Sequence, residues 1–197
     1  MSMKIGEARQ VYHIQIKAYQ EQKLILSKQK KELEQKIDNT PNGQELFANE
    51  AAILELTYNA VKEKQTEYQD YMNKLMGQWS AQANALSAKQ QDDAMAKYAE
   101  DIGKIMEVAR RIMNGDVVPA SDERKLMEFS SELYQSAKNI GAMIRQKEKK
   151  EYDSLWGDEE EKEYEDPLEA ADNTEAFSDG PKVVDGADTM SSVMATQ

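Results

Sequence analysis

Residues able to carry out catalysis are scarce in this chain of 197 residues. His13 is the only histidine and there is no cysteine, so neither a thiolate metal site nor a disulfide framework can form. A nucleophile–base pair would have to use His13, and no nucleophile elbow accompanies it. In a helix, His13 has Gln10 and Lys17 as neighbours, which predicts an exposed side chain. We therefore expect a protein that is not an enzyme and that binds no metal and no cofactor.

Carboxylate pairs are the other groups whose spacing bears on chemistry. Asp92-Asp93 and Asp122-Glu123 stand at the expected starts of helices, where capping and the helix dipole account for them. The acidic run at residues 158–166 lacks the loop pattern of a tight calcium site. These carboxylates therefore predict neither an acid–base pair nor a calcium site.

The elements that dominate the chain are long amphipathic helices. Over residues 47–86, apolar side chains recur in two rows with steps of seven, and the second row is offset by four and broken only at Gln65. Such a heptad pattern predicts one apolar stripe along a long helix, which needs a partner of similar length. The first row, the predicted hairpin seam, consists of Phe47, Leu54, Val61, Tyr68 and Leu75; the second consists of Ala51, Tyr58, Met72, Trp79 and Leu86.

The first part of the chain can supply that partner. Residues 4–37 read as a helix, and the turn-forming stretch at 38–44 contains Asn39, Pro41, Asn42 and Gly43. A short loop between two long amphipathic helices predicts an antiparallel hairpin over about residues 4–86. Its first helix carries a row of its own with steps of seven: Ile5, Tyr12, Tyr19, Leu26 and Leu33.

The heptad frame changes in the second half of the chain. A new pair of rows starts at Met95, so we expect a bend or short loop near residues 87–93; the alternative is one continuous helix over 45–113. Gly115 is placed for a left-handed helix end. A last helix is expected from Asp122 to about Tyr152, where Ala137 and Gly141 allow a neighbouring helix to approach closely.

These patterns predict an all-α, elongated, coiled-coil-like bundle of three to four helices. The helical domain would span residues 1–156, with the long hairpin at about 4–86 and a second hairpin at about 94–152.

Charge is distributed unevenly. The formal net charge is −12, and residues 157–197 carry 13 acidic residues against two lysines, while residues 1–156 are nearly balanced. The balanced body argues against nucleic-acid binding, which needs a basic face. Residues 157–197 have few large apolar side chains, so we expect an acidic disordered tail. No apolar run is long enough to span a membrane and no signal-peptide pattern is visible, which predicts a cytoplasmic protein without membrane contact.

Two groups of side chains are candidates for binding a partner. Tyr152, Leu155 and Trp156 stand at the edge of the helical domain and would share one face of a helix, as in a peptide that docks into a groove. The alternative is that this face closes back on the helical body. Met76 and Trp79 lie near the point where the first helix runs out, so they need cover from the second hairpin, another copy or a client.

By elimination and by architecture, the sequence predicts a protein–protein interaction protein. One hypothesis is an adaptor or chaperone-like component that holds another helical protein; small, acidic, cysteine-free helical hairpins are common among export chaperones and stalk proteins of bacterial secretion and flagellar systems, which is an analogy of fold type alone. The other hypothesis is a self-assembling structural or scaffolding coiled-coil protein, for example of the phage type, whose partner is a second copy.

Overall fold

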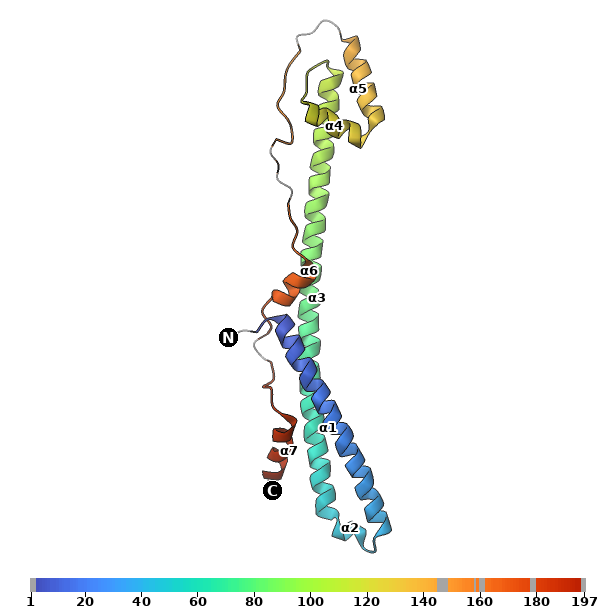
Figure 1. Cartoon of the computed structure of the whole chain (residues 1–197), viewed down its shortest axis with the longest axis vertical. Helices are drawn as coiled ribbons and strands as arrows, with labels where there is room; N and C mark the ends of the chain where they lie inside the picture. The colour runs from blue at the N-terminus through green and yellow to red at the C-terminus, as the bar shows by residue number, and fades with distance from the viewer. Residues whose placement is uncertain (1–2, 145–148, 158, 160–161, 178–179, 196–197) are drawn as a thin grey trace. The chain divides into compact units, whose positions relative to one another are not determined.

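The computed structural model describes residues 3–144, 149–157, 159, 162–177 and 180–195. Every regular element among them is a helix, which confirms the all-α class. The chain divides into unit 1, Met1–Leu86 with Glu165–Gln197, and unit 2, Ser87–Tyr164. The described residues form seven helices, more than the three or four expected: α1 Ile5–Asn39, α2 Gly43–Leu46, α3 Ala48–Met113, α4 Ala120–Phe129, α5 Ser131–Met143, α6 Pro167–Asn173 and α7 Gly186–Ala195 (Figure 1).

The core of unit 1 is the predicted helical hairpin. α1 and the first part of α3 lie side by side, joined through α2 (Figure 1). Asn42, at φ 57°, makes the left-handed turn that starts α2. Leu54 packs against the core partly buried, and Phe47 is half-buried at the turn. The buried seam positions are Ile5, Tyr12, Tyr19, Leu26 and Leu33 on α1 and Val61, Tyr68 and Leu75 on α3.

α3 runs without interruption for 66 residues, so the break expected near residues 87–93 is wrong and the continuous helix is correct. Residues 78–102 contain no glycine or proline and are rich in alanine, glutamine and lysine, which favour helix. The frame change falls where α3 passes from unit 1 to unit 2. It therefore marks a change of packing partner rather than an end of the helix.

Unit 2 is built around the end of α3. Gly115 has φ 81° as predicted; its nitrogen donates to the carbonyl oxygen of Ile112 and that of Asp116 donates to Arg111, the two bonds of a Schellman motif. α5 packs directly on this end, because a Cβ at Gly141 would lie 2.2 Å from the carbonyl oxygen of Ile112.

The single last helix expected from Asp122 to Tyr152 is wrong. Ser130 is extended at φ −157° and separates α4 from α5, and its hydroxyl accepts a hydrogen bond from the Leu133 nitrogen. α5 ends at Met143; residues 145–148, which the prediction included, lie outside the described residues, and residues 149–154 form no helix.

The C-terminal part of the chain is ordered over most of its described residues, so the expected disordered tail is wrong. It contains α6 and α7, and Ala171 and Ala176 are buried. The prediction failed because it considered only the apolar side chains that the tail itself contributes. The tail instead rests on the hairpin of unit 1, whose side chains satisfy its main-chain polar groups.

Candidate interaction surface

Four tyrosines lie together on the hairpin of unit 1. We call them the tyrosine row: Tyr12 and Tyr19 on α1, and Tyr68 and Tyr71 on α3. The spacing of seven puts Tyr12 and Tyr19 on one face of α1. Ring centroids are 4.7 Å apart for Tyr12 and Tyr71, 5.7 Å for Tyr12 and Tyr68, and 5.4 Å for Tyr19 and Tyr68. The rings form part of the core, and this leaves the hydroxyl groups to find polar partners at its edge.

Those partners are main-chain atoms of one segment. We call residues 174–190 the tail segment; 178–179 lie outside the described residues. The hydroxyl of Tyr71 donates to the carbonyl oxygen of Phe177 at 2.6 Å, and that of Tyr12 donates to Pro181 at 2.7 Å. The Tyr19 hydroxyl donates to the carbonyl oxygen of Val184 at 3.0 Å.

The Tyr68 hydroxyl both accepts a hydrogen bond from the tail segment and donates one to it. Its oxygen accepts from the Val184 nitrogen at 2.9 Å, and its hydrogen is directed to the carbonyl oxygen of Lys182 at 3.1 Å. Apart from a contact between the Tyr19 and Thr189 hydroxyls, the row's bonds to the tail segment end on main-chain atoms, so the row binds mainly the backbone of this segment.

The hydroxyl groups of the row are held as hydrogen-bond donors. Burial, and to a smaller extent the neighbouring Tyr71, raises the pKa of Tyr12 above its usual 10.0. Burial likewise raises the pKa of Tyr19. Both groups stay protonated well above neutral pH, so they can donate to carbonyl oxygens under all ordinary conditions.

Two glycines let the tail segment approach the hairpin. A Cβ at Gly180 would lie 2.8 Å from both the hydroxyl oxygen of Tyr12 and the ring of Tyr71. A Cβ at Gly186 would lie 1.8 Å from the Oε1 atom of Gln22. A side chain at position 180 would require the two tyrosines to move, whereas one at position 186 would require the flexible end of the Gln22 side chain to move.

Both ends of the tail segment are also anchored. Before the row, the Ile5 nitrogen donates to the carbonyl oxygen of Thr174 and the Ala176 nitrogen donates to Met3, each at 2.8 Å. After the row, the hydroxyls of Thr189 and Tyr19 lie 2.6 Å apart. The described residues of the tail segment therefore contact the hairpin on both sides of the four tyrosines.

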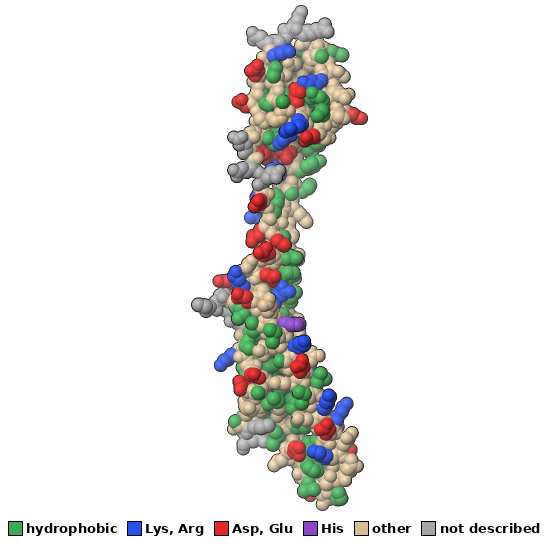
Figure 2. All heavy atoms as spheres, in the orientation of Figure 1, with side chains coloured by type: hydrophobic (Ala, Val, Ile, Leu, Met, Phe, Trp, Pro, Cys, Tyr) green, Lys and Arg blue, Asp and Glu red, His purple; other side chains and the backbone are tan. Residues whose placement is uncertain are grey.

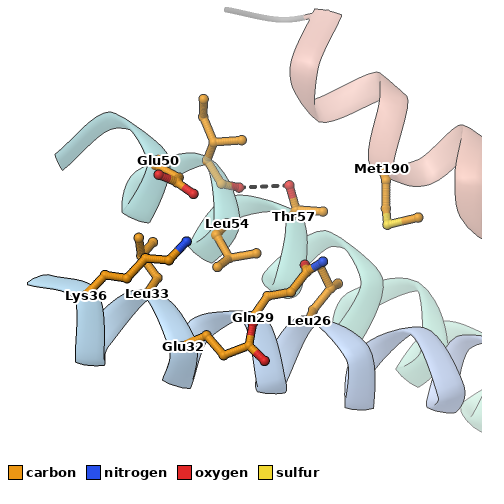
Figure 3. Close-up of a pocket in the computed structure, with 10 residues that line it drawn as sticks. Leu26, Gln29, Glu32, Leu33, Lys36, Glu50, Leu54, Thr57 and Met190 are labelled. Carbon is orange, nitrogen blue, oxygen red and sulfur yellow. Dashed lines mark hydrogen bonds between the residues drawn. The ribbon is translucent and has the colours of Figure 1, made fainter. Parts of the chain in front are cut away.

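A groove between α1 and α3 continues beyond α7, with a volume of about 720 Å³ (Figure 3). Figure 3 shows Met190 extending from α7 toward it. Leu26, Leu33 and Leu54 provide an apolar floor, and Lys36 and Glu50 lie among the charged side chains of its lining. The groove adds an apolar surface next to the main-chain site.

The predicted docking residues lie in unit 2. Trp156 is only 7 % exposed, and its indole nitrogen donates to Asp101 at 2.7 Å. Leu155 packs beside the same core, and the ring of Tyr152 lies under the Arg111 guanidinium at 4.0 Å. The three residues are not helical, and they lie against the unit in the way that the closing-back alternative describes. Their role in docking a partner stays a prediction.

The carboxylate pairs have roles other than capping. Asp122 is buried and accepts hydrogen bonds from the Ser154 hydroxyl at 2.6 Å and from the Leu155 nitrogen at 2.9 Å. Asp93 lies inside α3 and pairs with Lys162 at 2.5 Å. The explanation by helix starts is therefore wrong for Asp93 and incomplete for Asp122, which fastens the segment that carries Trp156.

The remaining candidates lie in unit 1. Trp79 packs partly buried against the hairpin core, with the Arg9 guanidinium 4.9 Å from its ring centroid. Met76 lines a shallow surface groove with Arg9 and Met72. His13 lies in the same groove and is exposed, as predicted. The described residues contain no cluster of three or more His, Asp or Glu side chains suited to a metal ion, and none of their helices is long and apolar enough to cross a bilayer.

Comparison with known proteins adds no relative: no protein-family model, no curated protein and no solved structure matches the chain. The candidate site therefore has to be judged on its own geometry. Sequence reasoning assigned Tyr12, Tyr19 and Tyr68 to apolar rows and did not consider their hydroxyl groups. The residue type was the signal that could have revealed the site, since the chain has nine tyrosines and only three phenylalanines. A tyrosine in a buried row needs a polar partner for its hydroxyl group.

Proposed function

We propose that this chain is a non-enzymatic adaptor or chaperone-like protein that holds an extended segment of a partner protein along the tyrosine row. The observation that carries this proposal is the convergence of four tyrosine hydroxyls on the main chain of one extended segment. Extended segments are commonly recognised through their main-chain groups, with side-chain pockets adding specificity.

The chemistry of the row suits binding better than catalysis. Tyrosine combines a large rigid apolar ring with a polar tip at low entropic cost, which is why it is enriched in binding hot spots. The raised pKa values of Tyr12 and Tyr19 keep both groups neutral, so they are poor bases and poor nucleophiles at neutral pH. Each hydrogen bond contributes on the order of 1 kcal/mol, and several together support reversible binding.

The proposed setting is the cytoplasm, without nucleic-acid or membrane contact. The partner would be another helical protein that presents an extended segment, or a second copy. Fold analogy with export chaperones and stalk proteins suggests a bacterial secretion or flagellar-type system.

A self-assembling scaffold is the second candidate. Its support is that the segment seated on the row belongs to this chain, so the same segment of a second copy has the right chemistry. Figure 2 shows hydrophobic side chains among charged ones on the visible face. Exposed apolar residues on α1, namely Ile14, Leu24 and Ile25, would add contacts between copies.

Point variants of the full-length chain test the proposal better than a truncation, because a chain ending before Trp156 would lose part of the unit 2 core. Affinity capture from native lysate would compare wild type with Tyr12→Phe/Tyr68→Phe/Tyr71→Phe, which removes three hydroxyls and keeps the rings. Tyr98→Phe is the matched control, since Tyr98 is 57 % exposed on α3 in unit 2.

We expect a discrete partner with wild type and with Tyr98→Phe, and its loss with the triple variant. Equal recovery with all three proteins would rule out the row as the binding site. Recovery of the protein alone, together with a concentration-dependent mass in solution, would favour the scaffold.

A further inference from the structure

We propose that the tail segment is an intramolecular ligand that competes with the partner for the tyrosine row, and that the partner segment shares its pattern. That pattern is an extended chain with glycine at the position of Gly180 and an N–H group at that of Val184, followed by a capped helix. This inference rests on the proposed function and names both the kind of partner and the competitor.

The first specificity element is the narrow space beside the hydroxyl ends of Tyr12 and Tyr71. Gly180 lies where any Cβ would come within 2.8 Å of Tyr12 and within 2.8 Å of Tyr71. Contacts below 3 Å force a movement, and both rings belong to the packed hairpin core. A segment with a larger residue at this position must lift away from the row.

The second specificity element is the pair of hydrogen bonds that the two main-chain groups of Val184 make with the row. Its nitrogen donates to Tyr68 at 2.9 Å and its carbonyl oxygen accepts from Tyr19 at 3.0 Å. A proline at this position would remove the donor and leave the Tyr68 oxygen without this bond. The register of the segment is therefore set at one residue, 184.

The third element is the helix that follows. The Asp185 carboxylate accepts from the Ala187 nitrogen at 3.0 Å, and the Thr189 nitrogen donates to the carbonyl oxygen of Asp185 at 3.1 Å. This arrangement starts α7 and places the Thr189 hydroxyl 2.6 Å from that of Tyr19. The row thus takes an extended segment whose end turns into a short helix.

The tail is attached in a way that allows its release. Its hold on the row consists mainly of hydrogen bonds, and its side chains Phe177 and Val183 are exposed, whereas Met190 packs partly buried against the hairpin core. Segments with few buried apolar contacts open at low free-energy cost. A tethered segment has an effective concentration on the order of 1 mM, so it weakens a competing segment without excluding it.

The test is a peptide titration against full-length protein. The probe is a fluorescently labelled synthetic peptide of residues 172–195, followed by anisotropy. The protein variant is Gly180→Leu, which obstructs docking of its own tail and leaves all four tyrosines intact. The control is Val183→Leu, a change of similar character at an exposed neighbouring position.

We expect the peptide to bind Gly180→Leu about 10-fold more tightly than it binds wild type or Val183→Leu, because the competing tail is removed. A peptide carrying leucine in place of Gly180 should not bind any of the proteins. Equal affinity for wild type and Gly180→Leu would overturn the competition, and absence of binding to a Gly180→Leu protein with wild-type helicity would overturn the assignment of the ligand. Neither result would contradict the proposed function, which is tested separately by whether the triple tyrosine variant fails to capture a partner from lysate.

A second measurement applies if Gly180→Leu does not fold. A Cβ at Gly6 would lie 3.3 Å from the Cβ of Asp172, close to the separation found in disulfides, and the chain has no other cysteine. Oxidised Gly6→Cys/Asp172→Cys should bind the peptide more weakly than the reduced protein and remain monomeric on a non-reducing gel. A cross-linked dimer, or equal binding in both states, would contradict an intramolecular competitor.

Discussion

The main-chain nitrogen of Val184 donates a hydrogen bond of 2.9 Å to the hydroxyl of Tyr68, joining α3 to a residue 116 positions further along the chain. The same hydroxyl is directed to the carbonyl oxygen of Lys182. One side chain of the hairpin core therefore sets the register of an extended segment. This relationship explains why an acidic stretch with few large apolar residues is ordered.

Removing the Tyr68 hydroxyl should loosen the tail and leave the hairpin intact. Tyr68→Phe keeps the ring but leaves the Val184 nitrogen without this acceptor, so we expect a loss of about 1 kcal/mol of unfolding free energy. Urea unfolding followed by circular dichroism measures the change. Tyr98→Phe, at an exposed position, should match wild type, and an equal loss in both variants would argue against a specific role for Tyr68.

The two glycines Gly141 and Gly103 should respond oppositely to the same substitution. Gly141→Ala forces a methyl group to 2.2 Å from the Ile112 carbonyl oxygen, so we expect a destabilisation of about 2 kcal/mol or more. Gly103→Ala meets nothing within 4 Å inside α3, so a stabilisation of about 0.5–1 kcal/mol is expected. Thermal unfolding of both variants checks the pair, and a stable Gly141→Ala protein would contradict the direct packing of α5 on α3.

Replacing Trp156 distinguishes a core residue from a docking residue. The buried ring and its bond to Asp101 predict that Trp156→Ala lowers the unfolding free energy of unit 2 by about 3 kcal/mol. Met143→Ala, at a position that is 81 % exposed, is the control and should change little. An unchanged melting temperature for Trp156→Ala, combined with loss of a captured partner, would instead support docking by Tyr152, Leu155 and Trp156.

Acid should weaken one ion-pair cluster at the end of α3. Hydrogen bonds from Arg110 and then Arg111 lower the pKa of Glu107 from 4.5 to about 2. A carboxylate whose folded pKa is lowered stabilises the protein above its unfolded pKa, and this contribution is lost as the pH falls from about 4.5 to about 2. Glu107→Gln should therefore be less stable than wild type at pH 7, by about 0.5 kcal/mol because solvent screens the pair, and equal to it only below a pH of about 2, where Glu107 is protonated. Paired melts at both pH values test this, and a difference that persists at low pH would assign the effect to packing.

The hairpin was predictable because each buried row repeats at seven residues and the turn residues Asn42 and Gly43 interrupt the pattern. The left-handed helix end at Gly115 was also predictable, because a glycine directly after the last apolar position of a helix is a local signal. The continuity of α3 was not, because a heptad frame records which partner a helix packs against, and that partner changes at the boundary between the two units. The break at Ser130 was missed because a single serine is compatible with both a helix interior and an N-cap.

The candidate site was only half visible in the sequence. Tyr12, Tyr19 and Tyr68 were placed on the correct faces, yet their hydroxyl partners lie more than 100 residues away in sequence. Composition classified the tail as disordered because it has no core of its own. The hydrogen-bonding groups that order the tail belong to the hairpin, and they come together only once the hairpin has folded.

The most direct measurement of the central claim is amide hydrogen exchange over residues 180–186 in the full-length protein, read by mass spectrometry or NMR. We predict that the Val184 amide is protected in wild type and exchanges much faster in Tyr12→Phe/Tyr68→Phe/Tyr71→Phe, while the hairpin core keeps its protection in both. Exchange at the rate of an unstructured peptide in the wild-type protein would contradict the docking of this segment on the tyrosine row.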